Sequence, residues 1–354
     1  TRVRSSAASD VYKRQGYDIY MKDNANELSE QRIVKSLDSF REIEGRLLAK
    51  NKITKVLIGG SPYDETSKFN NFILHQKNNA ILKIIDAQRV SAKKNGWGFV
   101  DFNEPMRKIS LEEQKRDSTF TFCRVDRIHP DNDGQMVMAY LFLKAQGLAG
   151  YEVSEFSIDA QHLDVIVHKN CKISKLKRGK KNLTFDYLAY ALPYPLDSIP
   201  RHGWGNMKSQ RDAMQLVPFM KEFNQERFQV HNLEKGIYQL TIDDQYIDNL
   251  SSGQLMKGIN LADYPTTPQY QQAMKIMYLN EERFEIEKRF REYLWTEYSF
   301  LRKEGPLFVD NQKAIDKLQE YLPKDLFLRA SYGWYIKAMH PEIRKVWKNY
   351  LNSI

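Results

Sequence analysis

The stretch RVDRIHPDNDGQMVMAYLFLKAQGL, from Arg124 to Leu148, joins a polar loop to a long apolar run. Asp126 and His129 lie three residues apart in the loop, and Pro130 follows directly. This spacing lets the carboxylate accept a hydrogen bond from one imidazole nitrogen while the other nitrogen faces a cleft, as a general base requires. The pattern therefore predicts a base at His129, oriented by Asp126, in front of a helix over 136–148.

The segments before this loop alternate between amphipathic helices and short apolar strands. Helices are expected at 27–50 and 78–94, and strands at 56–58 and 97–101. This alternation is typical of a parallel sheet covered on both faces, in which a site lies beyond the carboxyl ends of the strands. Three loops should reach that site: GGSPYDE (59–65), DFNEPM (101–106) and the loop that contains Asp126.

The composition changes after Gly150. Short stretches rich in Val, Ile, Phe and Tyr alternate with Gly, Asn, Asp and Pro, which predicts a mainly antiparallel unit with a tight hairpin turn at IDDQY (242–246). A long amphipathic helix is expected from Thr267 to about Lys303, with Pro268 in its first turn and two or three shorter helices after it. We therefore predict an α/β domain over 16–150, a β-rich accessory unit over 151–262 and a helical region over 263–354.

Residues from about Gly16 to Leu148 resemble the later half of the SGNH hydrolases, the GDSL family of esterases and lipases. The specific match is DRIHPDNDGQMVMAYLFL (126–143), which looks like that family's final block and places its triad Asp and His at Asp126 and His129. The resemblance implies a three-layer α/β/α parallel sheet of the SGNH hydrolase type with its N-terminal part missing. It also implies serine-dependent hydrolysis of a small-molecule or carbohydrate ester, with no cofactor and no metal.

The nucleophile of that family is not found in this sequence. The family carries it in a Gly-Asp-Ser block, with an oxyanion donor in a Gly-x-Asn-Asp block, and neither block is present. GYDIYMKDN, which begins at Gly16, looks like sequence just downstream of the Asn block, so the nucleophile is expected upstream of Gly16. SSAASDVYKRQ (5–15) resembles a translated sequencing adaptor of metagenomic reads, which predicts that residues 1–15 are a non-native leader.

Two expectations follow from this missing segment. The parent protein would be an active hydrolase, whereas the chain as written would have little or no hydrolase activity, because it keeps the base and its orienting carboxylate but lacks the nucleophile. The protein would be exported if the lost N-terminus carried a signal peptide.

Other catalytic and metal interpretations fit the residues less well. Ser61 follows a strand, but GGSP is not the Gly-x-Ser-x-Gly nucleophile elbow. A calcium loop in HPDNDG would require an acid in place of His129 and a Glu where Tyr140 stands. A metal phosphoesterase site would use Asp126, His129, Asp131 and Asp133 and would need further His or Asp clusters, whereas the remaining histidines are scattered singly.

The overall composition argues against some classes of partner. The 354 residues contain 54 Lys plus Arg and 45 Asp plus Glu, a net charge of +9, but basic and acidic residues are mostly interleaved. The densest basic cluster, KISKLKRGKKN (172–182), is typical of a solvated hairpin that turns at Gly179, so no nucleic-acid partner is expected. No apolar run approaches the roughly 18 residues of a membrane-spanning helix. Neither the oligomeric state nor the compartment follows from the two cysteines or from any other feature.

Binding is the alternative to hydrolysis. Tyr and Trp are frequent in LAYALPYPL (188–196), HGWGN (202–206), SYGWYIKAM (331–339) and KVWKNYL (345–351), and such rings can stack on sugars. The region 151–354 would then be a carbohydrate- or partner-binding module beside a degenerate hydrolase domain. Aromatic residues at this density are more often part of a core.

Overall fold

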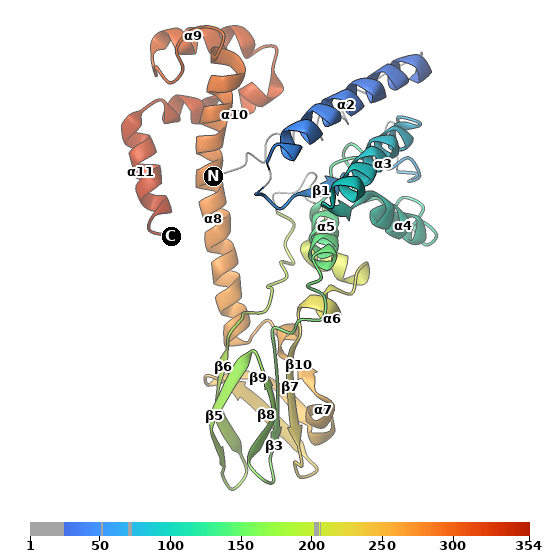
Figure 1. Cartoon of the computed structure of the whole chain (residues 1–354). Coiled ribbons are helices and arrows are strands. Elements are labelled where there is room, and N and C mark those ends of the chain that lie inside the picture. The colour runs from blue at the N-terminus through green and yellow to red at the C-terminus, as the bar shows by residue number, and fades with distance from the viewer. Residues whose placement is uncertain (1–24, 51, 70–72, 202–204, 206) are drawn as a thin grey trace. The chain divides into compact units, whose positions relative to one another are not determined.

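The computed structural model describes residues 25–50, 52–69, 73–201, 205 and 207–354, which form two compact units (Figure 1). The first unit comprises the described residues up to Ala191 together with those of Leu196–Ile237 and Leu250–Ala262. The second comprises Leu192–Pro195, Tyr238–Asn249 and Asp263–Ile354. The predicted leader over residues 1–15 and the segment that begins at Gly16 lie outside the described residues.

The first unit begins with a small parallel sheet. Strand β1 (Val56–Gly59) pairs in parallel with β2 (Gly98–Asp101), so that Val56 lies opposite Gly98. Helix α3 (Lys77–Asn95) connects the two strands and ends at Gly96, whose φ of 64° is in the left-handed region. Both predicted strands and the predicted connecting helix are confirmed.

Helices cover both faces of this sheet. Successive side chains of a strand point to opposite faces, and Phe99 packs with Ile85 of α3 whereas Val100 packs with Val137 of α5 (Asn132–Ala145). Helix α2 (Ala25–Leu48) packs on α3, where its Glu44 accepts a hydrogen bond from Ser91 at 2.5 Å. The architecture is therefore mixed α/β, as expected.

Two predicted boundaries near the sheet were wrong. Helix α5 begins at Asn132 rather than at 136, because the Asp131 carboxylate accepts a hydrogen bond from the Asn132 N–H and caps the polar first turn. DFNEPM, expected to be a loop, becomes the start of helix α4 (Asn103–Glu113), where Asp101 accepts a hydrogen bond from the Asn103 N–H at 2.9 Å. Met106, which is fully buried, anchors α4 to the core.

The β-rich part of the first unit contains a four-stranded sheet in the order β10-β7-β3-β4. Its strands are β3 (Ser154–Asp159), β4 (Asp164–Lys169), β7 (Glu226–His231) and β10 (Ile259–Asn260). Only the β3–β7 pair in this sheet is parallel, which agrees with the mainly antiparallel expectation. Phe156 of β3 stacks on Phe228 of β7 at 4.8 Å between ring centres and forms the centre of this core.

Shorter elements complete this unit. Strands β5 (Cys171–Arg178) and β6 (Leu183–Ala189) form a hairpin, and the Gly179 N–H donates to the carbonyl of Asn182 in the turn, as predicted for the basic cluster. The remaining elements are the 3₁₀ helices η1 (Gln210–Gln215) and η2 (Leu261–Asp263) and the short helices α6 (Phe219–Phe223) and α7 (Ser252–Lys257).

The second unit is mainly helical. Helix α8 (Pro268–Thr296) starts at Pro268 as predicted and continues into the π-helical turn η3 (Glu297–Leu301). The helices α9 (Gln312–Tyr321), α10 (Leu326–Ala338) and α11 (Pro341–Leu351) follow. Their apolar faces form one core with the end of α8. The expected helical C-terminal region is confirmed.

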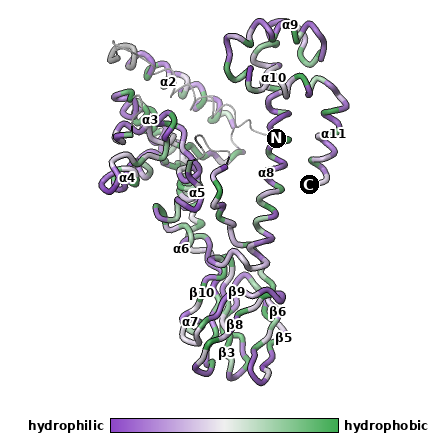
Figure 2. The backbone as a smooth tube through the Cα atoms, turned by 180° about the vertical axis from the view of Figure 1, so that it is seen from behind, coloured by the Kyte–Doolittle hydropathy of each residue, from purple (hydrophilic) through white to green (hydrophobic). Residues whose placement is uncertain are grey.

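A hairpin of β8 (Ile237–Ile242) and β9 (Gln245–Ser251) also belongs largely to the second unit. Asp243 and Asp244 adopt φ values of 49° and 63° in its two-residue turn, which is the conformation that the predicted tight turn requires. Figure 2 shows hydrophilic and hydrophobic residues mixed along the helices. No helix in the described part of the chain is long and apolar enough to cross a membrane.

Candidate active site

Asp126 and His129 meet in one turn just before helix α5. One carboxylate oxygen, Oδ1, accepts hydrogen bonds from the backbone N–H groups of Ile128 at 3.0 Å and His129 at 2.9 Å. The other oxygen, Oδ2, forms a hydrogen bond with His129 Nδ1. The two side chains are 23% and 24% exposed, so the pair lies at the surface without being fully solvated. The spacing thus produces the expected contact, and its catalytic role stays a prediction.

The hydrogen bonds keep Asp126 ionised. Burial raises the pKa of this carboxyl group, but the hydrogen bonds from the His129 side chain and from the backbone N–H groups outweigh burial and lower the pKa below its ordinary value. A charged Asp126 fixes the proton of His129 on Nδ1 and leaves Nε2 as the acceptor. This is the tautomer that a general base needs.

The predicted loops pack against one another at this turn. The Asp64 N–H donates to the Arg127 carbonyl at 2.9 Å, and the Ser61 hydroxyl donates to the Ile128 carbonyl at 3.4 Å, so GGSPYDE lies directly on the turn. DFNEPM, which forms the start of α4, is joined to this turn less directly, because Asn103 forms hydrogen bonds with Asn78 at the start of α3.

A buried lysine also lies near the pair. Lys77, the first residue of α3, is 3% exposed, and its ammonium lies 4.6 Å from the centre of the Tyr63 ring. Burial lowers the pKa of Lys77 to about 8, and the negative charge of Asp126 partly opposes this shift. Sequence reasoning missed Lys77, because no local pattern distinguishes it from the exposed lysines of the same helix.

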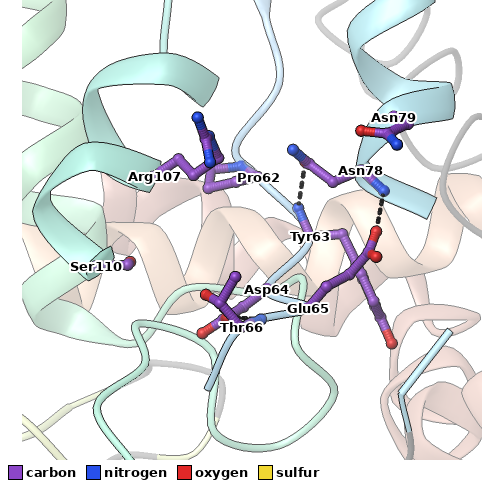
Figure 3. Close-up of a pocket in the computed structure, with 9 residues that line it drawn as sticks. All are labelled: Pro62, Tyr63, Asp64, Glu65, Thr66, Asn78, Asn79, Arg107 and Ser110. Carbon is purple, nitrogen blue, oxygen red and sulfur yellow. Dashed lines mark hydrogen bonds between the residues drawn. The ribbon is translucent and has the colours of Figure 1, made fainter. Parts of the chain in front are cut away.

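A polar cavity of about 140 Å³ adjoins the same loop (Figure 3). It is lined by Pro62, Tyr63, Asp64, Glu65, Thr66, Asn78, Asn79, Arg107 and Ser110. The wall is held together internally, because Asn78 accepts a hydrogen bond from the Tyr63 N–H at 3.0 Å and donates its own N–H to Glu65 at 2.6 Å. The Arg107 guanidinium makes no hydrogen bond or ion pair with the described residues, which leaves it available to a ligand.

The residues considered for an alternative nucleophile or a metal site have structural roles. Ser61 is 1% exposed, which is unsuitable for a nucleophile that must reach a substrate. Asp131 caps α5 and accepts the backbone N–H of Lys208, and Asp133 pairs with the Lys208 ammonium at 3.0 Å. Within the described ranges, no group of three or more His, Cys, Asp or Glu side chains is arranged to hold a metal ion.

The aromatic side chains proposed for binding are mixed in exposure. Tyr335 and Trp347 belong to the core of the helical unit, where Tyr335 is fully buried. Tyr190, beyond the end of β6, is 62% exposed. The tryptophan of HGWGN lies outside the described residues.

A second turn of the same kind was missed in the sequence. Asp159 accepts hydrogen bonds from the backbone N–H of His162 at 2.9 Å and from its ring Nδ1 at 3.1 Å, in the connection between β3 and β4. The His162 side chain is 63% exposed, and hydrogen bonding to Asp159 raises its pKa. An Asp-x-x-His turn therefore forms in two places, and only the turn at Asp126 packs against the cavity loop.

Comparisons with known proteins identify relatives of the chain. Residues 274–354 match the family described as the diltiazem deacetylase C-terminal helical domain. The solved structure of BT4096, a gut microbial diltiazem-metabolizing enzyme, is 46% identical in sequence, with a TM-score of 0.88. That similarity covers 96% of this chain and 77% of the other. No curated protein matches the chain.

Proposed function

The chain belongs to the same family as the gut microbial diltiazem-metabolizing enzyme, and on that premise we propose that it is the base-bearing part of an ester-hydrolysing deacetylase. The observation that carries the proposal is the partly exposed pairing of His129 with Asp126. Acyl transfer needs a base that accepts a proton at one ring nitrogen while the other is held by an anion, and this pair has that form.

The proposed mechanism is that of a serine hydrolase of the SGNH type. His129 Nε2 takes the proton of the attacking serine hydroxyl, and Asp126 stabilises the imidazolium that forms. The imidazolium then returns the proton to the departing alcohol. The serine and the main oxyanion donors are expected in sequence upstream of Gly16. The parallel pair β1–β2, with α3 on one face and α5 on the other, supports a three-layer sheet of this type.

The cavity at the loop that packs on this turn supports a polar leaving group. Its lining combines a guanidinium, amides, hydroxyls and carboxylates with the Tyr63 ring, a set of groups that suits a hydroxylated alcohol such as a sugar. We therefore propose small acyl esters of polar alcohols, including carbohydrates, as substrates. Diltiazem, named for the relative, is the first compound to test.

The test is acetate release from diltiazem and from an aryl acetate by the protein with its natural upstream sequence restored. We expect His129→Ala to lower turnover roughly 10⁴-fold or more. His162→Ala is the matched control, because it removes the exposed histidine of the second Asp-x-x-His turn and should leave turnover unchanged.

Residues 1–354 are assayed in parallel, and little or no turnover is expected from them. Turnover by these residues that disappears in His129→Ala would mean that the nucleophile lies within the chain. Turnover of the restored protein that survives His129→Ala would refute the proposed mechanism.

A further inference from the structure

Arg127 stands between the two proposed catalytic residues and is fully withdrawn from solvent. Arg127 is 1% exposed and is among the largest fully buried side chains of the described residues. Its backbone φ of 64° lies in the left-handed region, which residues other than glycine adopt at a cost in strain. A strained backbone and a buried guanidinium in one residue indicate that the surroundings hold this conformation in place.

The guanidinium joins the turn to the cavity loop. One terminal nitrogen, Nη1, donates to the carbonyls of Asp64 and Ser67, each at 3.1 Å, and the other, Nη2, donates to the carbonyl of Phe69 at 2.6 Å. The Arg127 carbonyl in turn accepts the Asp64 N–H at 2.9 Å. Four hydrogen bonds therefore connect this single residue to residues 64–69.

The same residue is also tied to its own turn. Its N–H donates to the Cys123 carbonyl at 2.9 Å, while its neighbour Asp126 receives the N–H groups of Ile128 and His129. Rotation of the turn against the loop would break all four bonds between Arg127 and residues 64–69, and Arg127 lies between the two residues of the pair. The orientation of the Asp126–His129 pair is thus coupled to the position of the loop that lines the cavity.

We propose that Arg127 is a positioning residue that holds His129 in hydrogen-bonding register with Asp126 by clamping the turn to residues 64–69, and this inference rests on the proposed function. The planar fork of arginine reaches three carbonyls at once, whereas the single ammonium of lysine cannot reproduce that pattern. Arg127→Lys therefore keeps the charge and loses the clamp.

The experiment observes the His129 ring directly by ¹⁵N-histidine NMR on the full chain, without any need for turnover. The Nδ1–H of His129, deshielded by its hydrogen bond to Asp126 and protected by that bond from exchange with water, should give a far-downfield proton signal in the wild type. Arg127→Ala should abolish or weaken this signal, and added guanidinium ion, far below denaturing concentration, should restore it by filling the vacated site. Sodium at equal ionic strength should not restore it.

Controls separate positioning from loss of structure. His162, bonded to Asp159 in the same way, reports on the remainder of the first unit and should not change. Arg116→Ala removes an arginine whose side chain is 77% exposed and should leave the His129 signal intact. If Arg127→Ala fails to fold, Arg127→Lys gives the answer, because it should fold and still weaken the His129 signal.

An unchanged His129 signal in folded Arg127→Ala or Arg127→Lys would overturn the inference. So would loss of the signal that guanidinium does not reverse in a folded Arg127→Ala protein. In the restored enzyme, Arg127→Lys should lower kcat roughly 100-fold with little change in KM, as expected for a base displaced by about 1 Å. If the His129 signal behaves as expected in the Arg127 variants but the restored enzyme has no esterase activity, the role of Arg127 stands and only the proposed function is refuted.

Discussion

The buried lysine beside the Asp126–His129 pair should destabilise the fold at neutral pH. The pKa of Lys77 falls from its ordinary value of 10.5 to about 8, because burial at 3% exposure disfavours the charged form. At about 1.4 kcal/mol per pKa unit, this difference corresponds to about 3 kcal/mol. Lys77→Met, which keeps the length of the side chain and removes the charge, should therefore raise the free energy of unfolding by about 3 kcal/mol at pH 7.

The effect has a defined dependence on pH. Below pH 8 both the folded and the unfolded protein hold the proton on Lys77, so the full cost is present. Between pH 8 and 10.5 the unfolded chain binds a proton that the folded chain has released, and stability rises with pH by up to about 1.4 kcal/mol per pH unit. The advantage of Lys77→Met should consequently shrink over this window and vanish near pH 10.5.

The assay must report on the first unit alone. Both cysteines, Cys123 and Cys171, are buried within that unit, so a thiol reagent labels them only when it opens. Samples are equilibrated in urea at pH 7, 9 and 10.5, then pulsed with the reagent at one common pH and analysed by mass spectrometry. The difference between variant and wild type at each pH removes the titration of all other groups.

Lys94→Met is the matched control, because this residue is an exposed lysine of the same helix and its replacement should change stability by less than about 0.5 kcal/mol at any pH. The reasoning fails if Lys77→Met is no more stable than wild type at pH 7, or if the two stability curves run parallel from pH 7 to 10.5. A gain in stability together with a loss of esterase turnover would indicate that the charge is kept for its effect on Asp126.

Four further substitutions have calculable effects. Gly134→Ala places a Cβ 2.6 Å from Pro130 Cβ and should lower the free energy of unfolding by about 1–3 kcal/mol in urea titrations, whereas Gly45→Ala, with nothing within 4 Å, should raise it by up to about 1 kcal/mol. Glu297→Ala leaves a buried tyrosine hydroxyl and the Phe308 N–H without an acceptor and should destabilise the helical unit by about 2–4 kcal/mol, measured by circular dichroism. Arg107→Gln should raise KM roughly tenfold for an ester with a polar leaving group, leaving kcat and the KM for a plain aryl acetate unchanged.

Elements with a strong local signal could be predicted from the sequence. Such signals determine the structure of the few residues around them. They are the apolar runs of β1 and β2, the glycine that ends α3 and the proline that starts α8. The two-residue turn of the β8–β9 hairpin is also local, because Asp tolerates the left-handed conformation that the turn requires.

Elements that depend on distant contacts could not be predicted. Helix α4 contains a proline and a polar surface, and the residue that fixes it, Met106, is recognisable only from its burial against the core. The polar first turn of α5 gives no apolar periodicity and depends on capping by Asp131. The lowered pKa of Lys77 likewise arises from its burial in the folded unit.

The two Asp-x-x-His turns mark the limit of prediction at the candidate site. Both sequences place an acidic side chain three residues before a histidine, and both form the same backbone and ring hydrogen bonds. What differs is the environment, since His129 is 24% exposed and His162 is 63% exposed. Local spacing thus makes the hydrogen bonds possible. The features that distinguish the pair at Asp126 come from elsewhere in the chain: the buried ammonium of Lys77 and the carbonyls that hold Arg127. The packing around the turn therefore decides whether an Asp-x-x-His pair can act as a base. Substitution of Arg127 or Lys77 tests this directly through its effect on the His129 ring.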